Sequence, residues 1–121
     1  MSTDQISFFD LASKRMTWST ARQGVVARNV ANADTPGARA RDVEPFEAYL
    51  ARATQTAREA PGAPAPHSET VRETWSTSPS GNGISLAEQT LAANEASGQH
   101  RLAADLYKKM NQLLIKAASA R

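Results

Sequence analysis

The strongest constraint in this sequence is a repeated spacing of small and apolar residues at both ends of the chain. These residues follow one another at alternating steps of three and four, which is the pattern of a coiled-coil seam. In the second stretch Leu102 and Leu114 widen the apolar stripe. The positions are Phe9, Ala12, Met16, Ser19, Gln23, Val26, Val30 and Ala33, and then Ala92, Ala96, Gln99, Ala103, Leu106, Met110, Leu113 and Ala117. The spacing predicts two long helices, over residues 1–34 and 84–121.

Local signals mark the inner ends of these two helices. Pro36 disfavours the helical conformation at Thr35, and the Pro-Gly pair at 36–37 suits the centre of a type II turn. Ser85 followed by Glu88 forms a capping box, in which the side chains satisfy backbone N–H groups of the first helical turn. At 1.5 Å per residue the helices would be roughly 45 and 50 Å long. Helices of that length must lie along something outside this short chain.

The middle of the chain has a different composition. Residues 35–58 are expected to form the turn, an extended segment and a short helix, because Pro45 suits a first helical turn. One side of that helix would be formed by Phe46, Tyr49, Leu50 and Ala53. From 59 to 83 Pro, Ala, Ser, Thr and Gly dominate, and the run APGAPAP favours extended, polyproline-like conformations. This stretch is expected to be a flexible linker.

The composition indicates thin helices without a large core. Alanine supplies 23 of the residues in the hydrophobic set, whereas Leu, Val, Ile and Phe together number only 19. With 14 basic and 12 acidic residues the net charge is +2, so the chain lacks the high charge of a disordered protein. Alanine-rich helices form readily but bury little apolar area each. We therefore expect the helices to gain stability by packing against other chains.

No segment offers the residues of a catalytic, metal or cofactor site. His67 falls in the linker and His100 on the polar side of the second helix, and neither has other ligands at metal-binding spacing. The acidic residues Asp42, Glu44 and Glu47 suit the start of the short helix better than a paired-carboxylate site. The chain has no cysteine, no apolar run of about 18 residues and no recognisable signal peptide. A non-enzymatic protein without cofactors, metals or membrane insertion is expected.

Nucleic-acid binding is the main alternative that the charges suggest. Between residues 14 and 41 there are six basic residues against one acidic residue, Asp34, and basic residues can contact phosphates. The six are Lys14, Arg15, Arg22, Arg28, Arg39 and Arg41. They are spread around the helix, however, and few aromatic residues are present for base stacking. A solvated face, or one that meets other protein chains, is the better interpretation, and no nucleic-acid partner is expected.

Residues 27–37 read ARNVANADTPG and closely resemble the ANNxANxxTPG signature of the axial proteins of the bacterial flagellum. These proteins build the rod, the hook and the hook-associated segments. The continuation RARDV at 39–43, the short chain, and GNGISL at 81–86 before the C-terminal helix resemble the proximal-rod members of this family. The resemblance implies a mainly α fold, in which the N- and C-terminal helices pair as a coiled-coil-like subunit of a helical tube.

The resemblance also implies a function and a set of partners. The chain would be a structural subunit of the proximal rod, in the drive shaft that transmits torque from the rotor base. The implied partners are other copies of the chain, other rod proteins, the MS ring of the rotor base, rod-adaptor proteins and the flagellar type III export apparatus. The implied location is the rod in the periplasm, reached without a cleaved signal peptide. A non-closing interface between copies propagates such a helical assembly. Another member of the axial family is the alternative.

Three sets of residues are candidates for carrying these roles. The resemblance assigns a signature turn to Asn29, Asn32, Thr35, Pro36 and Gly37. Its asparagine side chains are expected to bond to backbone at the helix end. The assembly seam comprises Phe9, Met16, Val26, Val30, Leu102, Leu106, Met110 and Leu113. Export recognition is assigned to Ile6, Phe8, Phe9 and Leu11, because an apolar N-terminal cluster can bind a partner groove before folding.

Overall fold

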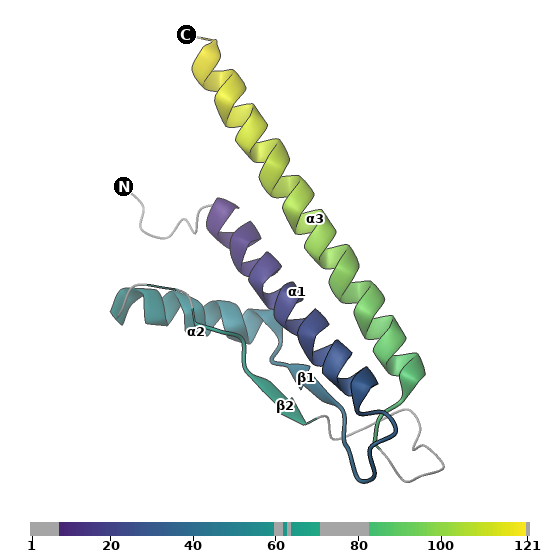
Figure 1. Ribbon diagram of the computed structural model, residues 1–121. Helices are drawn as coiled ribbons and strands as arrows, with labels where there is room; N and C mark the ends of the chain where they lie inside the picture. The colour runs from purple at the N-terminus through teal and green to yellow at the C-terminus, as the bar shows by residue number, and fades with distance from the viewer. Residues whose placement is uncertain (1–7, 60–61, 63, 71–82, 121) are drawn as a thin grey trace.

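A computed structural model describes residues 8–59, 62, 64–70 and 83–120 of the chain. Within these residues the fold is mainly helical, as predicted, with a single pair of very short strands. The elements in chain order are α1 (Phe8–Ala31), β1 (Arg41–Val43), α2 (Phe46–Glu59), β2 (Ser68–Thr70) and α3 (Leu86–Ser119). Figure 1 shows α1 and α3 side by side, with α2 and the strands on the other side of α1.

The long helices α1 and α3 pack together in opposite directions, which confirms that the two ends of the chain pair. Near the start of α1, the rings of Phe9 and Tyr107 meet edge to face with their centroids 5.0 Å apart. Small side chains from the predicted spacing are buried on both helices, and they allow the close approach: Ala12, Ser19, Ala96 and Ala103. With 34 residues against 24, α3 is about 51 Å long and α1 about 36 Å. The C-terminal part of α3 therefore continues past the first turn of α1 (Figure 1).

The helix boundaries agree closely with the sequence signals. Ser85 is the N-cap of α3, and its hydroxyl accepts a hydrogen bond from the N–H of Glu88 at 3.4 Å, as the capping box predicts. The first helix ends at Ala31, three residues before the predicted end at Asp34. The reason is that a turn begins at Asn32, so the helix has already ended before the position where Pro36 would stop it.

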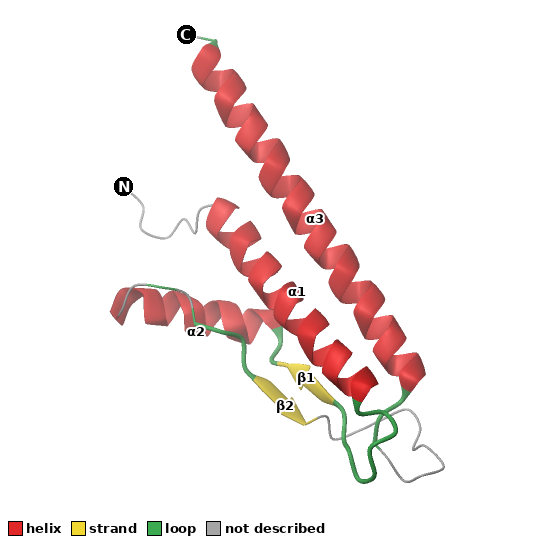
Figure 2. Cartoon of the chain, viewed as in Figure 1, coloured by secondary structure: helices red, strands yellow, loops and turns green. Residues whose placement is uncertain are grey.

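The linker prediction does not hold at residues 68–70, which form β2. This strand pairs antiparallel with β1, so that Arg41 faces Thr70 and Val43 faces Ser68 (Figure 2). Just before it, the N–H of Glu44 donates to the carbonyl of His67 at 2.8 Å. Extended residues suit this pairing because the backbone groups of β1 need partners. The prediction of flexibility for 60–61, 63 and 71–82 lies outside the described residues.

The predicted short helix is present as α2, and it encloses a second small core. Trp18 of α1 and Val43 of β1 are buried there together with Tyr49 and Ala53, which lie on the predicted inner side of α2. The hydroxyl of Tyr49 donates to the carbonyl of Pro64 at 3.0 Å. Burial raises the pKa of this hydroxyl. Because α1 contributes one face to α3 and another to this core, the two parts of the fold share a helix.

Candidate assembly site

Two successive turns lead from α1 to β1. The N–H of Thr35 donates to the carbonyl of Asn32 at 3.0 Å, and the N–H of Ala38 donates to the carbonyl of Thr35 at 3.1 Å. Gly37 is the third residue of the second turn and has a φ of +77°. A type II turn requires this left-handed conformation at that position, and glycine adopts it without strain. Asn32, Thr35, Pro36 and Gly37 are all exposed, so this part of the signature turn lies on the surface.

Asn29 is the signature residue that lies inside the molecule, with 4% of its surface exposed. Its Nδ2 donates to the carbonyl of Arg41 at 2.7 Å and to Oε1 of Gln89 at 2.8 Å. Its Oδ1 accepts from the N–H of Arg41 at 3.0 Å. Asn29 therefore ties α1 to β1 and α3, rather than bonding to the end of its own helix as the sequence suggested. The amide suits this place because it offers donors and an acceptor together.

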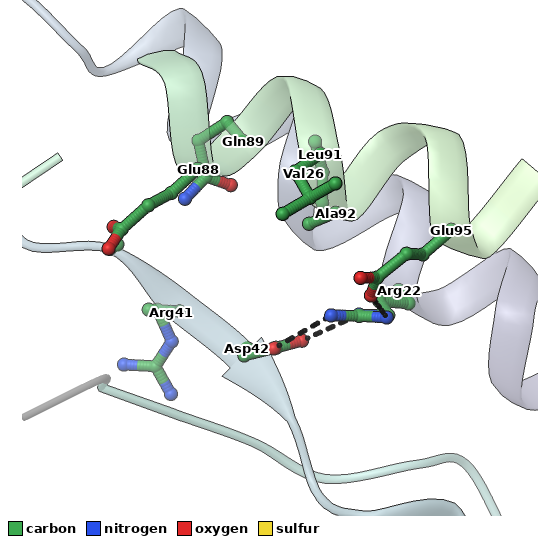
Figure 3. Close-up of a pocket in the computed structure, with 10 residues that line it drawn as sticks. Arg22, Val26, Arg41, Asp42, Glu88, Gln89, Leu91, Ala92 and Glu95 are labelled. Carbon is green, nitrogen blue, oxygen red and sulfur yellow. Dashed lines mark hydrogen bonds and ion pairs between the residues drawn. The ribbon is translucent and has the colours of Figure 1, made fainter. Parts of the chain in front are cut away.

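Arg22 forms a second bridge between the same elements, seven residues earlier on α1. Its Nε lies 3.3 Å from Oδ1 of Asp42 on β1, and its Nη1 lies 3.1 Å from Oε2 of Glu95 on α3. Figure 3 shows the guanidinium between the two carboxylates, with Val26 and Ala92 between the helices nearby. The hollow that these residues line has a volume of about 280 Å³. Because the arginine is mostly shielded from water, these ion pairs are weakened less by salt than exposed ones.

Trp18 connects α1 to α2, although it is not among the candidate residues predicted from the sequence. Its Nε1 donates to the carbonyl of Glu44 at 2.7 Å, and its ring meets that of Phe46 edge to face. The guanidinium of Arg15 lies over both rings, 4.9 and 4.4 Å from their centroids. Trp18 falls one position outside the predicted spacing. Its helical spacing to Ala21 and Val25, which pack in the same core, is the signal that would have indicated a second apolar face.

Glu44 ties β1, α2 and the segment before β2 together. Its carboxylate accepts from Nη2 of Arg52 and from the N–H of His67, the latter at 3.0 Å. The hydrogen bond from Arg52 is the main cause that lowers the pKa of Glu44, although burial acts in the opposite direction. Arg52 also donates to the carbonyl of Ala65 at 2.9 Å. The carboxylate of Glu44 therefore links three segments of the fold.

Several of the basic residues considered for nucleic-acid binding make contacts inside the chain. Arg15 stacks on aromatic rings and Arg22 bridges two carboxylates. Arg41 donates from Nη2 to the carbonyl of Ser68 at 2.8 Å, across the strand pair. These contacts favour a role in the fold over a role in binding phosphates.

The assembly seam is divided between the interior and the surface. Val26 is buried, while Phe9, Met16 and Met110 are partly buried. The other members are exposed by 42 to 61%: Val30, Leu102, Leu106 and Leu113. The small residues of the spacing thus pack α1 against α3, and larger ones remain on the surface, where other chains can reach them.

An apolar groove of about 240 Å³ opens where the described helices meet. It is lined by Phe8 and Leu11 of α1, Phe46 of α2, and Leu102 and Leu106 of α3. Phe8 and Leu11 are also export candidates, and both are exposed. The other two export candidates differ, since Phe9 is partly buried and Ile6 lies outside the described residues.

No group of three or more His, Cys, Asp or Glu side chains lies close enough in the described part of the chain to hold a metal ion. No helix in the same part has the length and hydropathy needed to cross a bilayer.

Comparison with known proteins gives two matches. Residues 9–39, from α1 through the signature turn, match the family model described as "Flagella basal body rod protein". The chain is also 34% identical to the "Flagellar basal body rod protein FlgB" of Agrobacterium fabrum over 126 aligned positions. That alignment covers 94% of this chain and 94% of the relative.

Proposed function

Because the chain belongs to the flagellar basal body rod proteins, we propose that it is a structural subunit of the proximal rod. It is a member of a structural family, it associates with other rod components, and its place is the flagellar basal body. In this role it packs with copies of itself and with other rod proteins into the helical shaft that carries torque outward from the rotor base.

The observation that carries this proposal is the exposed apolar surface of α3. Leu102, Leu113 and Ile115 are each exposed by about 60%, and Leu106 and Leu114 by 42% and 51%. Contiguous exposed apolar surface on a small protein marks a site of interaction. In a tube of packed helices, this surface is buried between neighbouring chains.

The internal bridges supply the stiffness that a drive shaft needs. The ion pairs of Arg22 and the hydrogen bonds of Asn29 each link α1 to β1 and to α3, and these two residues lie about seven positions apart along α1. Two separated attachment points resist rotation of α1 against α3 better than one. Torque applied to one helix is thereby passed to the other without sliding.

The remaining partners and the route of export form the finer part of the proposal. The proposed neighbours at the base are the MS ring and the rod-adaptor proteins, and the rod lies in the periplasm. The type III export apparatus delivers the chain without removal of a signal peptide. The exposure of Phe8 and Leu11 supports export recognition there, because apolar side chains at the start of α1 are accessible to a receptor groove.

Charged substitutions in the assembly seam test the proposal. Val30→Asp and Leu106→Asp should each abolish motility and rod assembly, because burial of an unpaired charge between chains costs several kcal/mol. Both positions are exposed in the single chain, so the variants should still accumulate and be exported. The measurement is swarming in a deletion strain complemented by each variant, with immunoblots of isolated basal bodies.

Asn94→Asp is the matched control, since it adds the same charge at an exposed polar position of α3. This variant should swim normally. Loss of distal-rod proteins from the basal bodies of the Val30→Asp and Leu106→Asp strains would place the chain at the proximal end. Normal swimming of either strain would contradict the assignment of these residues to the seam.

A further inference from the structure

Two aromatic rings hold the guanidinium of Arg15 in place on the surface of α1. Its central carbon lies 4.9 Å from the ring centroid of Trp18 and 4.4 Å from that of Phe46. These rings meet edge to face, with their centroids 5.9 Å apart. An aromatic face attracts the positive charge but accepts none of the five N–H groups in the way an oxygen does. The rings therefore position Arg15 without using its hydrogen-bond donors.

These donors have no acceptor within the described residues. Three described arginines are partly shielded from water, and two of them are paired: Arg22 contacts two carboxylates, and Arg52 contacts Glu44. The guanidinium of Arg15 forms no ion pair and no hydrogen bond in the described part of the chain. The fold thus supplies carboxylates to the other two shielded arginines and leaves Arg15 without one.

The donors of Arg15 are also accessible from outside. Among the described residues, the buried side-chain atoms without a hydrogen bond include no nitrogen of Arg15. Since these nitrogens have no partner in this part of the chain and the residue is half-buried, they keep accessible surface. The side chain lines a hollow that it shares with Trp18, Phe46 and Glu47. An acceptor from another molecule can therefore reach the guanidinium.

The surroundings of Arg15 favour a carboxylate over a phosphate. Asp42 and Glu47 line the same hollow, and they repel a doubly charged phosphate more than a singly charged carboxylate. On the other side of Arg15 the lining is apolar, with Phe8 and Leu11 of the same helix. A carboxylate also matches the guanidinium in shape, because it can accept two parallel hydrogen bonds from it. An aspartate or glutamate on a mainly apolar protein surface fits both the charge and this lining.

We propose that Arg15 binds the carboxylate of an aspartate or glutamate on a neighbouring chain of the rod. The proposal rests on the function as a rod subunit and names the chemistry of one contact between chains. Because Arg15 is already held by two rings, little of its side-chain freedom is lost when the carboxylate binds. The site is partly shielded from water, so salt weakens this pair less than a fully exposed one.

Zero-length crosslinking tests this contact. Arg15→Lys keeps the positive charge and places a primary amine at position 15, and a water-soluble carbodiimide joins an amine to a carboxylate that touches it. The variant would replace the native chain in a deletion strain, and isolated basal bodies would be treated with the reagent. We expect a product larger than the single chain on a denaturing gel. Mass spectrometry of this product should find position 15 linked to an aspartate or glutamate of a neighbouring chain.

The matched control is Arg28→Lys, which changes an exposed arginine later on the same helix. Position 28 should give several-fold less interchain link than position 15. Equal yields, or a link from position 15 only to an acidic residue of its own chain such as Glu47, would overturn the proposal. Swimming of the Arg15→Lys strain shows separately that the rod function is intact. A motile strain without the interchain link would therefore contradict the contact while leaving the proposed function standing.

Charge reversal gives a second test that does not need assembly of the lysine variant. Arg15→Glu would bring two negative charges together and should abolish swarming, whereas Arg28→Glu should swarm. Suppressor mutants of the Arg15→Glu strain that swim again should carry lysine or arginine in place of an aspartate or glutamate of a rod protein. Suppressors confined to position 15 and to its aromatic neighbours Trp18 and Phe46 would show that Arg15 acts only within its own chain, which would overturn the proposal.

Discussion

Among single residues, Asn29 and Arg22 decide how the long helices are held. Each reaches from α1 to β1 and to α3, and each is largely shielded from water. A complete hydrogen bond in such surroundings adds little to the free energy of unfolding, because it replaces hydrogen bonds to water in the unfolded chain. Loss of one partner is costly, because the other polar group is then buried without a hydrogen bond. The buried bridges should therefore be more sensitive to substitution than the exposed signature turn.

Asn29→Asp tests this directly, because it keeps the shape of the side chain and replaces its donors with a charge. The new carboxylate would face the carbonyl of Arg41 and Oε1 of Gln89, which are both acceptors. We expect a loss of about 3 kcal/mol in the free energy of unfolding. The measurement is urea unfolding followed by circular dichroism, with exposed Asn32→Asp as the control. Equal effects of the two substitutions would show that the buried bridge has no special weight.

The lowered pKa of Glu44 allows a prediction of how the stability of the protein depends on pH. This pKa is lowered in the folded protein, mainly by the hydrogen bond from Arg52. The unfolded chain therefore binds more protons in the acid range, so stability rises with pH there. This contribution is complete above the ordinary glutamate pKa and is lost as the pH falls through the lowered value.

Glu44→Gln should remove that contribution and flatten the acid limb of the stability profile, as measured by thermal unfolding at a series of pH values. Exposed Glu47→Gln serves as the control for loss of a charge near the start of α2. An unchanged acid limb in the Glu44→Gln variant would show that the bond to Arg52 does not form in solution.

At the scale of elements, the helices and their ends were predictable because their signals are local. Ser85 and Glu88 mark the start of α3, and residues 36–37 mark the turn after α1. The strand pair was not predictable, since Ser68–Thr70 has no strand pattern and is ordered only by the neighbouring β1. The partners of Asn29 and Trp18 were also beyond the sequence, because they lie 12 to 60 residues away.

Substitution of two glycines by alanine should change the free energy of unfolding in opposite directions. Gly37→Ala should destabilise the turn by about 1–2 kcal/mol, because its positive φ is unfavourable for a residue with a Cβ. Gly24→Ala should stabilise α1 by about 0.5–1 kcal/mol, since it lies inside a helix with no atom within 4 Å of the added Cβ. Chemical denaturation of both variants measures the difference. A stabilising Gly37→Ala would contradict the turn geometry.

At the scale of the whole molecule, the longest helix, α3, buries small side chains and leaves large apolar ones on the surface. Ala96 and Ala103 are buried on α3, whereas Leu102 and Leu113 of the same helix are exposed. A protein that functioned alone would be expected to do the reverse. The heptad spacing identified the helices from the sequence, but the division of the assembly seam became clear only in three dimensions. We propose that this division lets the chain pack with neighbouring chains.

The most direct test of the central claim is mass spectrometry of purified basal bodies from the source cell. If the chain is a rod subunit delivered by type III export, it should be present in intact basal bodies. Peptides from its N-terminal end, including residues 4–10, should be detected as well, because no signal peptide is removed. Absence of the chain from intact basal bodies would contradict its role as a structural subunit of the rod.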